Sequence, residues 1–254
     1  MAGALLRLNF WPFAAAGLWL LALPASPGFA ACSVPAEAFL FEPLLPRTVA
    51  TLSAGRPVKV VAIGSASTDG RAAGGPEHAW PQQFKIFLSQ KFPAATISVV
   101  NLAKPRQTAA EMVKRFEKEI IPLAPALVIW QTGTVDAVDG IDLADFRGTL
   151  QSGFNRLRAV SEVVVMDPQF SRRTRAMIDF GPYESVMREV ADANSVPMFP
   201  RSDLMRAWSE AGEFDYSVAD KDARREMARR LYACIGSALA AFVTRRVPAR
   251  GSGR

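Results

Sequence analysis

PVKVVAI, at residues 57–63, is a short run rich in β-branched residues that ends at Gly64 and Ser65. Two further apolar runs lie downstream, ALVIW at 126–130 and EVVVM at 162–166. The hydrophobic residues in these runs are consecutive and do not alternate with polar ones, which is typical of strands buried on both faces of a sheet. Such strands are parallel and need helical crossovers between them. These runs therefore predict an α/β fold.

Helical spacing of apolar residues marks the segments between the strands. Strands are expected at 57–63, 96–102, 126–130, 162–166 and 196–199. Helices are expected at 36–52, 80–92, 108–121, 143–160, 183–194, 203–208 and 220–243. Five βα units in succession predict one three-layer α/β/α sandwich with a parallel five-stranded sheet of flavodoxin-like type. In such a sheet, ligands bind beyond the carboxyl ends of the strands.

The first thirty residues are interpreted as a signal peptide. Arg7 supplies a positive charge, Phe10 to Leu23 is apolar, and Gly28-Phe29-Ala30 offers the small residues of a cleavage site. The apolar part is shorter than the roughly 20 residues that span a membrane. Residues 29–32 also resemble a lipobox, so a lipid anchor on Cys32 is the alternative. Either interpretation places the protein in the periplasm or outside the cell.

The remaining chain is expected to form one domain with two appendages. The predicted parts are a signal peptide at 1–30, an N-terminal arm and helix at 31–56, an α/β domain at 57–245 and a basic disordered tail at 246–254. Half of the 254 residues are hydrophobic and 21% are charged, which is a globular composition. No stretch resembles a nucleic-acid-binding motif.

The net charge of +6 is spread along the chain, with two local clusters. One is Arg172, Arg173 and Arg175, and the other is the tail from Arg245 to Arg254. These clusters indicate affinity for an acidic partner such as lipid headgroups or an anionic polymer. The alternative is that they are a solvated face and a frayed tail.

The chain has two cysteines, Cys32 and Cys234. Export would place both in a compartment where disulfides persist. One bridge would then join the N-terminal arm to the last helix and close a loop of about 200 residues, which stabilises the fold by several kcal/mol in the chain-entropy model. Two unpaired thiols are the alternative, and a lipid thioether would consume the Cys32 sulfur.

Four segments at strand ends together resemble a known family. They are VAIGSAST at 61–68, VIWQTGT at 128–134, VVMDPQ at 164–169 and Tyr-Ala-Cys at 232–234. Their order and spacing are similar to those of the SGNH/GDSL hydrolases, most closely an exported bacterial branch, and the likeness runs from Val58 to about Val243. The resemblance implies the SGNH-hydrolase type of α/β fold and an ancestry in ester hydrolysis.

The catalytic blocks of that family are degenerate in this chain. The family's nucleophilic serine follows the glycine of the first block by two residues, and Ala66 stands there. The second block supplies a glycine amide to the oxyanion hole, and the matching residue is Ala103. The asparagine of the third block corresponds to Val135. The Asp and His of the fourth block correspond to Ala223 and Glu226.

Other residues near the first block could carry displaced chemistry. Ser65 or Ser67 could act as a nucleophile assisted by Asp69, by Asp136 or by the single histidine, His78. The alternative is that these polar residues cap the following helix and satisfy the amides of the turn.

Polar residues at the strand ends are the expected ligand-binding groups. These are Thr68, Asp69, Lys104, Gln131, Thr134 and Asp167. Asp136 and Asp167 could do acid/base work or hold a hard cation weakly, or they could cap helices. Lys104 and Arg106 could bind an anionic group or could be ordinary surface charges. No metal site and no cofactor is predicted.

The sequence supports three hypotheses about function. The first is a monomeric binding or accessory protein without standard esterase activity, whose ligand is a small molecule, a glycan or a lipid. The second is an ester or acyl hydrolase acting on lipids or acylated glycans through a displaced serine. The third is a weakly membrane-associated accessory protein recruited by the basic tail or by a lipid on Cys32.

Overall fold

The computed structural model of the chain describes residues 32–245, except 36, 37, 40, 41 and 43. The expected signal peptide at 1–30 and the expected basic tail at 246–254 lie outside the described residues. Within the described part, no helix is long and apolar enough to cross a membrane.

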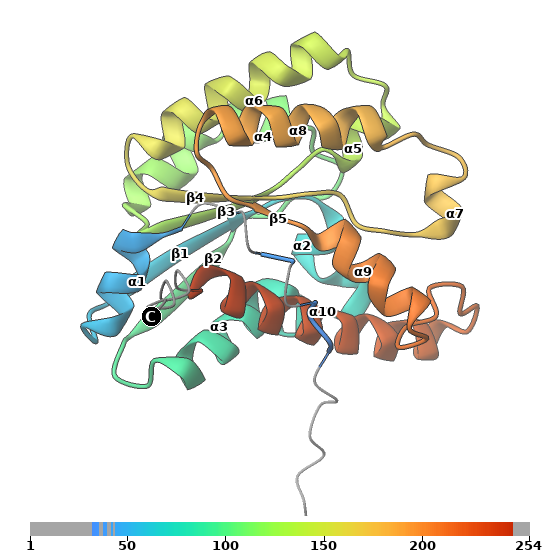
Figure 1. Cartoon of the computed structure of the whole chain (residues 1–254), viewed down its shortest axis with the longest axis horizontal. Helices are drawn as coiled ribbons and strands as arrows, with labels where there is room; N and C mark the ends of the chain where they lie inside the picture. Colours follow the sequence, from blue (N-terminus) through green and yellow to red (C-terminus); the bar gives the residue numbers. More distant parts are fainter. Residues whose placement is uncertain (1–31, 36–37, 40–41, 43, 246–254) are drawn as a thin grey trace, which may run out of the picture. The chain divides into compact units, whose positions relative to one another are not determined.

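The centre of the molecule is a five-stranded parallel sheet (Figure 1). Its strands are β1 (Val58–Ile63), β2 (Ile97–Asn101), β3 (Leu127–Gln131), β4 (Glu162–Met166) and β5 (Met198–Phe199). The spatial order is β2-β1-β3-β4-β5, and every neighbouring pair is parallel. This order is flavodoxin-like, so the predicted fold class is confirmed.

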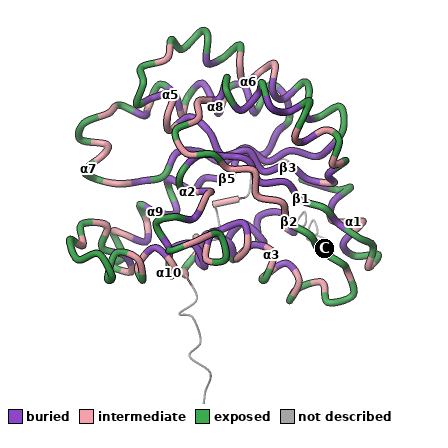
Figure 2. The backbone as a smooth tube through the Cα atoms, turned by 180° about the vertical axis from the view of Figure 1, so that it is seen from behind, coloured by how far each residue is buried: buried purple, intermediate pink, exposed green. Residues whose placement is uncertain are grey.

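Helices cover both faces of the sheet. One layer contains α4 (Ala109–Val113), α5 (Thr134–Val138), α6 (Leu143–Arg158) and α8 (Gly181–Ala193), and the other contains α3 (Trp80–Lys91) and α10 (Lys221–Val243) (Figure 1). Successive β1 residues point to opposite faces: Val60 packs in the core under α3 and α10, and Val61 in the core under α4, α6 and α8. Figure 2 shows the resulting belt of buried backbone through the strands.

The expected helix at 108–121 is broken in the structure. Only α4 is α-helical, and it is followed by a π-helix at Phe116–Ile120 and a 3₁₀-helix at Ile121–Leu123. Pro122 explains why the α-helix does not continue past this point, because it has no N–H for the carbonyl of Lys118 and its ring crowds that carbonyl.

The expected helix at 36–52 is also shorter than predicted. Helix α1 covers only Pro46–Ser53, and Ala38 and Phe39 form a turn ahead of it. The start of α1 is fixed by Pro46 in its first turn and by the Glu162 carboxylate, which accepts the amides of residues 47 and 48 at 3.1 and 2.6 Å.

Short helices occupy several segments that were expected to be loops. They are α2 (Ala66–Asp69), the 3₁₀-helices η1 (Arg71–Ala73) and η2 (Pro76–His78), α5, and α7 (Arg172–Arg175). The remaining helix, α9 (Arg201–Glu210), begins two residues earlier than predicted. Helices α2, α5, α7 and α9 follow the carboxyl ends of strands, either directly or after a short turn. They build the edge of the sheet where a ligand would bind.

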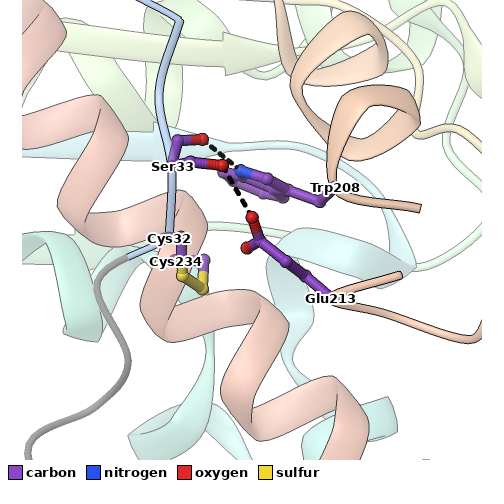
Figure 3. Close-up of a disulfide and its surroundings, with 5 residues drawn as sticks. All are labelled: Cys32, Ser33, Trp208, Glu213 and Cys234. Carbon is purple, nitrogen blue, oxygen red and sulfur yellow. Dashed lines mark hydrogen bonds between the residues drawn. A yellow bond between two sulfur atoms is a disulfide. The ribbon is translucent and has the colours of Figure 1, made fainter. Parts of the chain in front are cut away.

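A disulfide joins the N-terminal arm to α10, as predicted. It links Cys32 to Cys234, with 5.5 Å between the Cα atoms and 202 residues between them in sequence (Figure 3). The next arm residue, Ser33, accepts a hydrogen bond from the Trp208 indole and donates one to Glu213 at 2.6 Å. The arm is therefore held by α10, by α9 and by the loop that connects them.

Candidate functional site

The switch point of the sheet lies between β1 and β3, where the winding reverses. The buried side chain of Gln131, the last residue of β3, reaches under the turn that follows β1. Its Oε1 accepts hydrogen bonds from the amide of Ser65 at 3.0 Å and from the hydroxyls of Ser67 and Thr68 at 3.3 and 3.1 Å. Gln131 and Thr68, both predicted as binding residues, thus meet at this point, and Gln131 anchors the turn.

Ala66 stands at the exposed tip of that turn, as the first residue of α2. Gly64 allows the close approach below it, because a Cβ there would lie 2.9 Å from Gln131 Oε1 and closer still to the Thr68 hydroxyl. Gly70, in the left-handed region at φ 91°, ends the short helix. The side chain that the turn presents to solvent is therefore a methyl group.

The hydroxyls on either side of Ala66 are held by other partners. Ser65 is buried, and its Oγ accepts a hydrogen bond from the amide of Arg106 at 3.0 Å. Ser67 donates to Gln131 and accepts from a guanidinium nitrogen of Arg201 at 2.9 Å. An amide oxygen and a guanidinium do not take up a proton at neutral pH. Neither contact can therefore act as a general base for a serine.

Arg201 is a site residue that the sequence analysis missed. It lies at the start of α9, just after β5, and only 1% of its surface is exposed. Burial lowers the pKa of its guanidinium to about 10, which leaves it charged at neutral pH, and the nearby Asp167 partly opposes this shift. Within the described part of the chain, its Nε and Nη2 have no hydrogen-bond partner. A polar residue just beyond the fifth strand was the available signal.

Asp167 follows β4 and is 4% exposed. One of its carboxylate oxygens accepts the amide of Ser202 at 2.9 Å. Burial raises the pKa of this carboxyl to about 8, and the positive charge of Arg201 acts in the opposite direction. Arg201 thus interacts electrostatically with the buried Asp167 and donates a hydrogen bond to Ser67.

Asp136 caps backbone amides. Its carboxylate accepts the amide of Ala109, at the start of α4, at 2.9 and 3.2 Å, and the amide of Gly133 at 3.2 Å. Burial raises the pKa of this carboxyl, and the hydrogen bonds from the amides oppose part of that rise. The side chain thus makes the contacts of a helix cap, whereas no hydrogen bond in the described structure joins it to Ser65 or Ser67.

The residues of the second and third blocks lie around the same turn. The amide of Ala103 donates to Asn101 Oδ1 at 3.1 Å, and Asn101 Nδ2 donates to the carbonyl of Thr68 at 2.7 Å. Val135 lies in α5 and is half-buried. The Thr134 hydroxyl accepts a weak hydrogen bond from Gln131 Nε2 at 3.5 Å.

Charged candidates near the second block are paired on the surface. Lys104 bonds to Glu119 at 3.1 Å, and Asp69 pairs with Arg71 at 2.9 Å. A small cavity of about 290 Å³ opens here, lined partly by Asp69, Arg71 and Ala103. This cavity adjoins the β1–α2 turn, because Asp69 of α2 is one of its lining residues.

No hydrogen bond or ion pair among the described residues joins the remaining candidates to the turn. Ala223 and Glu226 are exposed in the first two turns of α10, where Glu226 lies 3.8 Å from Arg229. His78 ends η2 and lies 3.7 Å from the neighbouring carboxylate of Glu77. Among the described residues, no group of three or more His, Cys, Asp or Glu could hold a metal ion.

A model of the Non-GDSL lipase-like family matches residues 31–249 of the chain. The chain belongs to this family. Its match covers every strand of the sheet and the whole of the site described above. A search of curated proteins found no match.

Solved structures of esterases share the fold of this member of the Non-GDSL lipase-like family. A two-domain esterase active on acetylated mannans, crystallised with mannopentaose, superposes with a TM-score of 0.63 at 16% identity over 82% of this chain. The chain spans only 57% of the length of that esterase. A lipase/acylhydrolase from Enterococcus faecalis gives 0.53 at 21% identity, over 68% of this chain and 94% of that one.

An acetyl xylan esterase gives a TM-score of 0.53 at 15% identity, over 69% of this chain and 98% of its own. At these identities the likeness shows a common fold. The SGNH/GDSL type of α/β fold expected from the sequence is therefore confirmed.

Proposed function

We propose that this protein is an exported member of the family that binds a ligand at the carboxyl edge of its sheet without hydrolysing it. The observation that carries the proposal is the methyl group of Ala66 at the exposed tip of the β1–α2 turn. A carbon without a hydroxyl or thiol cannot form an acyl-enzyme.

The surroundings of the turn support the same proposal. Ser65 and Ser67 are hydrogen-bonded to groups that do not accept a proton. The Ala103 amide, at the family's oxyanion position, already donates to Asn101. Val135 offers no donor at the other oxyanion position. The Cys32–Cys234 disulfide is compatible with export.

Ester hydrolysis by Ser67 is the competing candidate. It is favoured by the Arg201 guanidinium on Ser67 Oγ, because a cation stabilises a developing alkoxide. The structural relatives described as esterases are consistent with it. Neither of the groups bonded to Ser67 in the described structure, the Gln131 amide oxygen and the Arg201 guanidinium, can accept the serine proton.

An esterase assay with a fluorophosphonate label separates the two candidates. The purified protein should hydrolyse p-nitrophenyl acetate at the buffer rate, at least about 10⁴-fold below the ~10 s⁻¹ that is typical of enzymes. Ala66→Ser should stay near that background because the base is still missing. The proposal would be overturned if the unmodified protein turns over the ester and takes up the label, and if Ser67→Ala abolishes both while Ser161→Ala preserves them.

A further inference from the structure

A second and larger hollow lies at the carboxyl edge, away from the β1–α2 turn. Its volume is about 700 Å³, and its walls come from the start of α7, after β4, and from the loop between α9 and α10. Figures 1 and 2 draw both segments on the side toward which the strands run. We call this hollow the α7 groove. Its volume falls within the range of pockets that enclose small-molecule ligands.

Three arginines line the α7 groove and have no partner of their own. Arg172 and Arg173 come from α7, and Arg224 comes from the first turn of α10. All three are exposed, and none of their side chains forms a hydrogen bond or an ion pair with any described residue. Arg175, in the same sequence cluster, differs because it pairs with Glu184. The structure thus singles out three of the basic residues as available to a ligand.

The acidic groups around the groove are already engaged. Asp215 is the acidic residue in the lining, and its carboxylate accepts the hydroxyl and the amide of Ser217, which lowers its pKa. Asp220 caps α10, and Glu213 accepts the hydroxyl of Ser33. Three positive charges therefore face one negative charge inside the hollow.

Phe214 and Tyr216 also line the groove, where Phe214 is only 4% exposed and Tyr216 is partly exposed. The rings of Phe214 and Tyr216 are stacked at 6.2 Å with 9° between their planes, and Phe214 packs on Trp208. The Tyr216 hydroxyl donates to the carbonyl of Met205, which holds the ring in place. The partly exposed Tyr216 offers the groove an aromatic surface for the C–H groups of a sugar ring, and the exposed arginines suit carboxylates.

We propose that the α7 groove binds an acidic oligosaccharide, with the carboxylates of its sugars paired to Arg172, Arg173 and Arg224. A hollow with walls favours a ligand that enters it over a flat membrane surface. The inference deepens the proposed function. It rests on that proposal only in the assumption that the bound ligand is released without being hydrolysed. Guanidinium–carboxylate pairs in the groove would be partly exposed, so binding weakens as the salt concentration rises.

Calorimetric titration of the full chain with trigalacturonate tests the proposal. The matched neutral probe is the fully methyl-esterified trigalacturonate, which keeps the sugar rings and removes the charges. The charged probe should bind at least about tenfold more tightly than its methyl ester. Arg172→Gln/Arg173→Gln and Arg224→Gln should each weaken binding of the charged probe by about tenfold or more.

Arg56→Gln is the control variant, because Arg56 is exposed and precedes β1 at the opposite edge of the sheet, and the change removes one positive charge, as Arg224→Gln does. It should leave the affinity within about twofold. Three results would overturn the proposal: equal affinity for the methyl ester, no difference between the groove variants and Arg56→Gln, or failure to bind trigalacturonate at millimolar concentration. A different outcome would assign the groove to a membrane surface. In that case the protein sediments with phosphatidylglycerol vesicles, the groove variants abolish this sedimentation, and no saccharide binds.

The proposed function is measured separately in the same samples. The esterase assay reports hydrolysis, and the titration reports binding at the groove. Hydrolysis combined with tight trigalacturonate binding would remove the non-hydrolytic proposal and leave the acidic-oligosaccharide site standing.

Discussion

At the scale of single residues, Asp167 is the buried acid whose environment has a measurable consequence. Burial at the end of β4 raises its pKa from 3.8 to about 8, against the opposing charge of Arg201. Between these two pH values, the folded protein retains a proton that the unfolded chain releases. Stability therefore falls as pH rises through this window, because the unfolded state binds fewer protons than the folded state.

Asp167→Asn should remove this pH dependence. The amide stays neutral and keeps an oxygen that can accept the amide of Ser202. From pH 4 to pH 8 the variant should gain stability over the parent by up to about 1.4 kcal/mol per pH unit. Urea unfolding at several pH values measures the difference. Asp192→Asn, at an exposed position, should follow the parent curve, and an unchanged slope in Asp167→Asn would contradict the assigned pKa.

The sequence located some residues of the site and not others for a physical reason. Gln131, Asp136 and Asp167 follow buried strands, so the strand-end rule placed them at the edge before any contact was known. Arg201 obeys the same rule but follows the two-residue strand β5, whose sequence signal is weak. Its bond to Ser67 depends on how α9 docks, which no local pattern encodes.

At the scale of elements, the buried Asp136 carboxylate couples two helices. It lies in α5 and accepts amides from the start of α4 and from Gly133. Buried amides that lose their acceptor keep the full cost of desolvation. Acid/base catalysis, the other role considered for Asp136, would require contacts other than these backbone amides.

Asp136→Ala should destabilise the fold by about 2–4 kcal/mol, because two buried amides lose a charged partner. Asp136→Asn should cost about half as much, since one carbonyl oxygen remains. The midpoint of urea unfolding gives both values, provided that the dependence on denaturant is unchanged. Asp139→Ala, at the exposed end of the same helix, is the control. Equal stability of Asp136→Ala and Asp139→Ala would disprove the capping role.

Strands were easier to predict from the sequence than helices. All five were located from their apolar runs, because burial on both faces requires a continuous hydrophobic segment. The helix expected at 108–121 ends as an α-helix at Val113, because apolar spacing does not reveal a π-helical or 3₁₀ turn, and Pro122 stops it from continuing further. The short helices α2, α5 and α7 carry too few residues to show a periodic pattern, and tertiary contacts decide their conformation.

At the scale of the whole molecule, the carboxyl edge carries two separate hollows. The smaller one, of about 290 Å³, adjoins the β1–α2 turn, and the α7 groove, of about 700 Å³, lies beside the α9–α10 loop. That loop and the N-terminal arm share the contact between Ser33 and Glu213. The stability of the arm therefore bears on the shape of the groove.

The Cys32–Cys234 disulfide closes a loop of 202 residues and should stabilise the fold mainly by restricting the unfolded chain. The variant Cys32→Ser/Cys234→Ala should lose about 2–5 kcal/mol and melt at a lower temperature. Dithiothreitol should lower the melting temperature of the parent protein and leave that of the variant unchanged. Trigalacturonate binding should weaken in parallel, because releasing the arm frees Ser33 from Glu213 beside the groove. A parent protein that melts at one temperature with and without reductant would show that the arm is held by its hydrogen bonds and packing alone.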